Sequence, residues 1–211
     1  MLVYKSGVGI TLTLTVLTPF LSNSNLRTRT MSNYEVTNAS QAYTAHRVTF
    51  TSGKHIKDVI ALLDLEVNRS GCGLELRNFL NSTDSKKSLE EGLNKLTEGT
   101  RDFLFFSAGS HSKWLNVYFE GKRTFPETHI YMIGNPLIAQ TMLQHNLGAG
   151  LHIPPKILIE EIEGGGGTRI TYDSAASTMF SNGNEELREA TKALDDKLEG
   201  LIRRVLSHSK L

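Results

Sequence analysis

Histidine and glutamate side chains are the groups in this sequence that could carry acid–base chemistry. None of the seven histidines stands in the H-E-x-x-H spacing that places two ring nitrogens on one helix face for a metal ion. His111 and His145 fall in or beside predicted loops, and Glu160 lies in a predicted strand before a turn. Sites often form at such positions, so these three are candidate site residues. Alternatively, these three side chains are scattered over the polar surface without forming a site, because histidines are common there.

A helix start follows the apolar segment that ends at Gly134. Asn135 can cap the first amides of a helix, and Pro136 suits the first helical position because its missing N–H is not needed there. Amides at a helix start can also bind an anion. Gly134 and Asn135 are therefore candidate residues for a small anionic ligand, unless Asn135 itself occupies those amides.

The lone cysteine and a glycine run indicate structure rather than chemistry. Cys72 is the only cysteine, which excludes an intramolecular disulfide and a cysteine-clustered metal site. It follows a predicted helix end, where the helix dipole disfavours a thiolate. The run from Gly164 to Gly167 lacks the Lys and the following helix of a phosphate loop and predicts a β-hairpin. No metal and no cofactor is predicted.

The charge balance argues against nucleic acid as a partner. Lys and Arg total 23 and Asp and Glu total 22, a formal net charge of +1, whereas nucleic-acid domains usually carry a basic excess. Segment 114–123, WLNVYFEGKR, mixes aromatic and basic residues as single-strand binders do. A strand with one buried face explains the same alternation, so a strand is predicted there and no nucleic-acid partner is expected.

The composition of residues 1–33 predicts a separate, disordered tail or a targeting segment. They contain Lys5, Arg27 and Arg29 but no Asp or Glu, which is typical of a mitochondrial presequence. A start at Met31 would instead leave a cytoplasmic protein; a secretory signal is less favoured. The apolar stretch is too short and too polar to span a membrane, so no integral span is expected. Without these three cations the net charge falls from +1 to −2.

The elements that must position the candidate residues alternate between strands and helices. Period-2 patterns predict strands, and stripes of 3.6-residue period predict helices, one of them capped by Thr51 or Ser52. Strands are predicted at 43–50, 101–108, 114–121, 125–134, 156–163 and 168–173. Helices are predicted at 56–67, at 74–80, from 84 or 85 to 98, at 136–146 and at 184–208.

The last predicted helix, 184–208, is long and amphipathic. Asn184 is a suitable cap, Glu185 and Glu186 lie in the first turn, and Arg203 and Arg204 lie near the end, which suits the helix dipole. A leucine-rich stripe runs along one face. Such a stripe usually packs on its own domain; the alternative is a partner helix.

Three sequence features follow one another along the chain. They are Gly134-Asn135-Pro136 after an apolar strand, the turn from Leu151 to Pro155, and the glycine hairpin that ends at Tyr172. In this order and spacing, the chain resembles the family named domain of unknown function 302 over about residues 43–180. It is similar to the longer eukaryotic, fungal-type members. It departs from the compact bacterial pattern in the N-terminal tail, in segment 71–100 and in the C-terminal helix.

The resemblance implies an α+β fold, with an antiparallel sheet and helices packed mainly on one face, and often a homodimer. It implies no reaction and no catalytic residues. The sequence therefore predicts a small-molecule-binding or assembly module rather than an enzyme. The alternative is a hydrolase-like or other enzyme whose site forms from His111, His145 and Glu160 only in the fold.

Overall fold

The computed structural model describes residues 36–179 and 183–207. The predicted tail or targeting segment, 1–33, lies outside the described residues. The chain divides into two units, Met1–Ser40 and Gln41–Leu211, and the elements below all belong to the second unit. In the part of the chain that is described, no helix is long and apolar enough to cross a bilayer.

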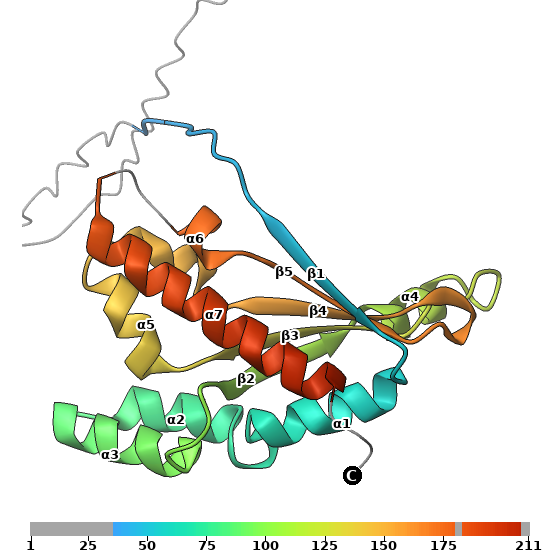
Figure 1. Cartoon of the computed structure of the whole chain (residues 1–211), viewed down its shortest axis with the longest axis horizontal. Helices are drawn as coiled ribbons and strands as arrows, with labels where there is room; N and C mark the ends of the chain where they lie inside the picture. The colour runs from blue at the N-terminus through green and yellow to red at the C-terminus, as the bar shows by residue number, and fades with distance from the viewer. Residues whose placement is uncertain (1–35, 180–182, 208–211) are drawn as a thin grey trace, which may run out of the picture. The chain divides into compact units, whose positions relative to one another are not determined.

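A five-stranded sheet forms the centre of the second unit, with the strand order β1-β5-β4-β3-β2 and every pair antiparallel. The alternating apolar pattern of these segments produces strands with one buried face. Ile159 and Ile170 are buried, whereas Glu160 and Arg169 lie on the opposite face. The strands are β1 (Arg47–Ser52), β2 (Leu104–Ser110), β3 (Thr128–Gly134), β4 (Lys156–Glu161) and β5 (Thr168–Asp173) (Figure 1). The predicted hairpin joins β4 to β5.

Helices supply the rest of the core, and the α+β fold class is confirmed. The helix α7 crosses the strands (Figure 1) and packs on α1, α5, α6 and β1. The helices are α1 (Ile56–Glu66), α2 (Leu74–Ser82), α3 (Lys86–Thr97), α4 (His111–Tyr118), α5 (Pro136–Leu143), α6 (Ala175–Thr178) and α7 (Glu185–Ser207). Three short 3₁₀ turns lie at Arg69–Gly71, Leu147–His152 and Glu163–Gly165.

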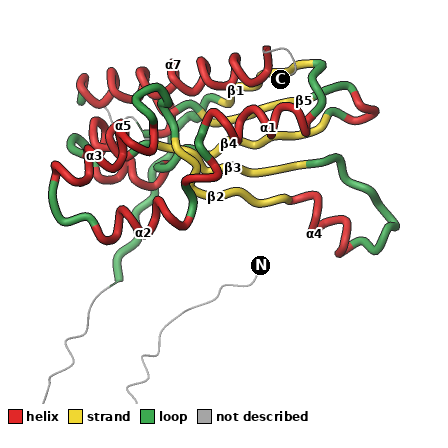
Figure 2. Tube along the Cα trace, turned by 90° about the horizontal axis from the view of Figure 1, so that it is seen from below, coloured by secondary structure: helices red, strands yellow, loops and turns green. Residues whose placement is uncertain are grey.

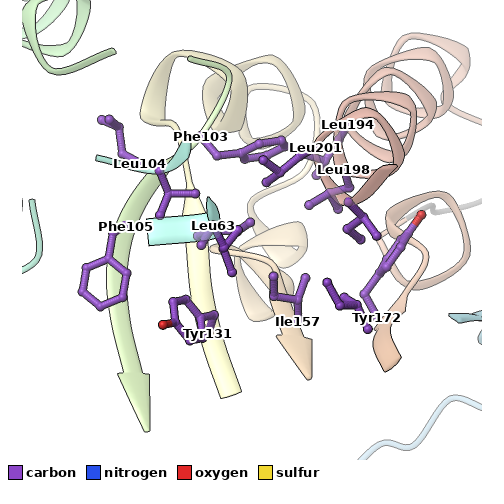
Figure 3. Close-up of a cluster of buried hydrophobic side chains, with 14 of the residues drawn as sticks. Leu63, Phe103, Leu104, Phe105, Tyr131, Ile157, Tyr172, Leu194, Leu198 and Leu201 are labelled. Atoms are coloured by element: carbon purple, nitrogen blue, oxygen red, sulfur yellow. The ribbon is translucent and has the colours of Figure 1, made fainter. Parts of the chain in front are cut away.

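The apolar stripe of α7 is buried within the chain. Leu194, Leu198 and Leu201 have at most 2% of their surface exposed. They point toward the sheet beside Phe103 and Tyr172 (Figure 3). Asn184 caps the helix as predicted, because its Oδ1 accepts a hydrogen bond from the Leu187 N–H at 2.8 Å. Packing inside the domain therefore explains the stripe without a partner helix.

The predicted strand at 114–121 is wrong, because this segment forms the helix α4. Ser110 caps the helix by accepting a hydrogen bond from the Lys113 N–H at 3.1 Å. The inward residues are Ser112, Leu115, Asn116 and Phe119, which follow the i, i+3, i+4, i+7 spacing of a helix. The period-2 placement of Leu115, Val117 and Phe119 was coincidental, and the Ser110 cap decided the local structure.

Two predicted helix ends also differ. Thr51 and Ser52 do not cap α1, because both belong to β1 and pair with β5. His55 caps it instead, its Nδ1 accepting a hydrogen bond from the Lys57 N–H at 3.2 Å. The helix α5 ends at Leu143, three residues before the predicted end. Asn146 then caps a 3₁₀ turn through the Gly148 N–H at 2.8 Å.

Candidate functional site

The structure separates the five candidate residues into three places. Gly134 and Asn135 lie at the carboxyl end of β3, beside an apolar cavity. His111 and Glu160 line a groove near the other end of β3, where Thr128 pairs with Glu160. His145 is exposed beyond the end of α5 and lines neither. The structure therefore does not bring the three residues of the enzyme alternative together. His111 and Glu160 lie near the start of β3, whereas His145 comes after α5, which follows the carboxyl end of that strand.

The α5 cavity, as we call the first of these, has a volume of about 220 Å³ and opens to solvent. Asn135 contributes the only polar side chain among its lining residues. They are Leu80, Phe103, Phe106, Gly134, Asn135, Pro136, Ile138, Ala139, Met142, Leu143, Ile153, Pro154, Pro155 and Leu194. Ligand sites commonly combine apolar walls with a few polar groups in this way.

Gly134 lies where two walls of the α5 cavity meet. A Cβ at this position would be 3.1 Å from the Pro154 Cβ and 3.5 Å from the Phe106 ring. Glycine therefore lets β3 approach the proline turn closely. Phe106 is the unpaired residue of a β-bulge between Phe105 and Ser107 in β2, and bulges redirect side chains. Consecutive aromatics thus serve different contacts: Phe105 packs edge-on against Tyr131, and Phe106 lines the cavity.

Asn135 occupies the amides at the start of α5. Its Oδ1 accepts a hydrogen bond from the Leu137 N–H at 2.9 Å. Its backbone carbonyl accepts from the N–H groups of Ile138 at 3.0 Å and Ala139 at 2.8 Å, and Pro136 has no N–H to offer. Every amide of this first turn thus has an acceptor, and the surrounding walls are apolar. This geometry favours an apolar ligand over the anion that the sequence suggested.

The groove that contains His111 and Glu160 is polar, and two of its carboxylates, those of Glu160 and Glu161, already have partners. Glu160 accepts a hydrogen bond from the Arg169 Nε at 3.1 Å. Glu161 accepts from the Glu127 N–H at 3.2 Å. Among the residues that the structure describes, no three His, Cys, Asp or Glu side chains are grouped to hold a metal ion. The groove therefore brings an acid and a histidine near each other without a metal-binding arrangement.

A polar network around the buried Tyr131, reaching the half-buried Asp64 of α1 and the exposed Arg69, was not predicted. The Tyr131 hydroxyl donates to Asp64 Oδ1 at 2.9 Å and accepts from Arg69 Nη1 at 2.8 Å. Arg69 also donates to Asp64 at 2.9 Å, and its guanidinium lies 5.0 Å from the centre of the Phe105 ring. Tyr131 is 62 to 67 residues away from these partners in sequence. No local pattern could therefore have identified the network, which ties α1 to the sheet.

Burial also sets the state of the remaining reactive side chains. Cys72 is buried, and burial raises the pKa of its thiol, which agrees with a structural role. Burial, and then the hydrogen bond to Asp64, raise the pKa of Tyr131 well above its usual value near 10. Burial, and then the charge of Asp195, raise the pKa of Tyr172 to about 12.

We expect the domain to lose stability above about pH 10 because of these two tyrosines. The unfolded chain releases the phenolic protons near pH 10 while the folded chain retains them, so the unfolded state binds fewer protons and unfolding becomes easier as pH rises. Between its unfolded and folded pKa values, each tyrosine lowers the free energy of unfolding by about 1.4 kcal/mol per pH unit. Urea unfolding from pH 9 to about 11 measures this slope. Tyr131→Phe should make it shallower, whereas Tyr118→Phe, at an exposed position, should not; equal slopes for both variants would contradict the prediction.

These features define an α+β domain with a five-stranded antiparallel sheet and an apolar cavity at the start of α5. The chain belongs to the family Domain of unknown function DUF302, whose model matches residues 81–205. This match includes residues 81–100 and most of α7, two of the segments in which the sequence is expected to depart from the compact bacterial pattern. A search of curated proteins found no match.

A solved structure supports the same fold. The chain is similar to an uncharacterised conserved DUF302 protein from Bacillus stearothermophilus, with a TM-score of 0.52 and 16% sequence identity. The similarity covers 75% of this chain and 97% of the bacterial chain. At this identity the comparison shows the shared fold and carries no activity across.

Proposed function

We propose that the domain binds a small, largely apolar molecule in the α5 cavity. The observation that carries this proposal is a preformed opening whose walls are apolar except for the side chain of Asn135. Apolar walls release ordered water when an apolar ligand covers them, which is favourable.

The cavity size indicates the class of ligand. An engineered cavity of about 150 Å³ lined by Leu, Ile and Phe accommodates benzene, and the α5 cavity is about 220 Å³. A single ring with a small substituent or a short acyl chain suits this volume. Larger drug-sized molecules usually occupy about 300 Å³ or more.

Binding is favoured over catalysis because of what lines the cavity. General acid–base or nucleophilic catalysis needs a titratable or nucleophilic side chain in contact with the substrate. None of the lining side chains carries one. The homodimer and the fungal-type grouping stay predictions; light scattering on the purified protein would test the first.

Replacing Ala139 with phenylalanine is expected to weaken ligand binding at least tenfold. Ala139 is half-buried and lines the cavity, so a ring there takes the space of the ligand. The matched control is Gln140→Phe, which adds the same ring at the next, exposed position of α5. Fluorine NMR of 4-fluorotoluene measures binding through line broadening. Broadening that is absent with the wild-type protein, or unchanged by Ala139→Phe, would contradict the proposal.

A further inference from the structure

The helix α4 exposes an apolar face that none of the other described elements, within 36–179 and 183–207, covers. Trp114, Val117 and Tyr118 are 56%, 74% and 76% exposed. Their i, i+3, i+4 spacing places them on one side of the helix; we call these three residues the α4 face. Single exposed apolar residues are ordinary, but a contiguous exposed patch usually marks an interaction surface.

Contacts on the opposite side of α4 hold this face outward. The Ser112 hydroxyl accepts a hydrogen bond from the Thr128 N–H at 3.0 Å. Asn116 Oδ1 accepts from the Phe125 N–H at 2.8 Å, and the Phe119 and Phe125 rings lie 5.2 Å apart. The helix therefore already has a packed inner side, and the α4 face is left for another surface.

Three cations flank the α4 face in the sequence. Lys113, Lys122 and Arg123 are exposed, and Glu120 is the only acidic residue between 111 and 125. This segment thus carries a net charge of +2, with histidine neutral, whereas the whole chain carries +1. The ion pair of Lys122 with Glu120, at 3.5 Å, is highly exposed on both sides, so it contributes little stability and both charges stay in solvent.

We propose that the α4 face docks on an anionic lipid surface. Trp and Tyr rings favour the boundary between headgroups and acyl chains, where one end of the side chain is apolar and the other wet. Lys and Arg beside them are attracted to anionic headgroups. Figure 2 shows α4 and the loop that follows it extending past the end of β2 and β3, where a flat surface can reach them. A second copy of this chain fits less well, because its cations would oppose the same cations.

The sequence provides a site-specific probe for this proposal. Trp114 is the only tryptophan among the 211 residues, so tryptophan emission of the full chain reports on the α4 face. With phosphatidylcholine vesicles that contain phosphatidylserine, we expect emission to shift to shorter wavelength, and co-sedimentation to give the affinity. Val117→Asp should weaken binding at least tenfold. The double variant Lys113→Gln, Arg123→Gln should also weaken it by at least tenfold, about fivefold for each cation.

The matched control is Leu147→Asp. Leu147 is an aliphatic residue outside α4 that is 83% exposed, and its replacement should leave vesicle binding unchanged.

Several results would overturn the proposal: no emission shift at lipid excess, an equal shift with pure phosphatidylcholine, or wild-type affinity for Val117→Asp. A shift that depends on protein concentration without vesicles would assign the α4 face to a second copy. A shift with a single-stranded oligonucleotide but not with vesicles would assign it to nucleic acid, and each of these also overturns the proposal.

Discussion

Replacing Gly167 with alanine is expected to lower the free energy of unfolding by about 3 kcal/mol or more. Gly167 has a φ of +109°, which L side chains rarely adopt. A Cβ there would lie 2.0 Å from the Ser52 carbonyl oxygen and 2.7 Å from the Gly53 Cα. These are backbone atoms at the end of β1, so no side-chain rotation can relieve the clash. The substitution must separate the β4–β5 hairpin from β1.

Gly164 in the same glycine run provides the matched control. Its φ of +78° is also positive, but a Cβ there meets no atom within 4 Å. Gly164→Ala should therefore cost only the backbone strain, about 1–2 kcal/mol. Urea unfolding followed by circular dichroism measures both variants. Equal losses would show that the contact with β1 is not the reason for glycine at 167.

Leu198→Ala is expected to destabilise the domain by about 2–5 kcal/mol. Leu198 is 1% exposed and lies at the centre of the α7 stripe, between Leu194 and Leu201 (Figure 3). Removing its side chain leaves a cavity between the helix and the sheet, and such a cavity adds to the lost burial energy. This effect would be intrinsic to one chain and independent of any partner.

The control for Leu198 is Asp196→Ala, an exposed position on the same helix. Its effect should stay within about 0.5 kcal/mol of zero. Urea unfolding gives the stability of each variant, and light scattering gives its mass. A Leu198→Ala variant that keeps wild-type stability but changes mass would contradict burial within the chain and assign the stripe to a partner.

Local patterns predicted the elements whose side chains obey one clear period. The strand pattern around Val48 and Phe50, the stripe of α1, and the glycine hairpin between β4 and β5 all occur near the predicted residues. Asn135 caps α5 and Pro136 takes its first position, as predicted. These features depend on contacts within a few residues, so the sequence contains all the information that they need.

The helix α4 shows where local patterns were insufficient. Segment 114–119 alternates as a strand does, and segment 112–119 also fits a helix whose inward residues, from Ser112 on, lie at i, i+3, i+4 and i+7. The choice depended on the hydroxyls of Ser110 and Ser112, which cap the helix and hold the start of β3. The second of these contacts spans 16 residues, so no short window contains it. The same contact leaves Trp114 and Tyr118 exposed.

The candidate site divides in the same way. By itself the sequence determined the fold class and the helix start at Asn135, because caps, turns and apolar periods are local interactions. Only the tertiary structure decided that Phe103, Phe106 and Leu194, from distant segments, complete an apolar cavity there, and that His145 is separated from His111 and Glu160. Side chains far apart in the chain meet only through the register of strands and the packing of helices, and neither can be derived from local residue types.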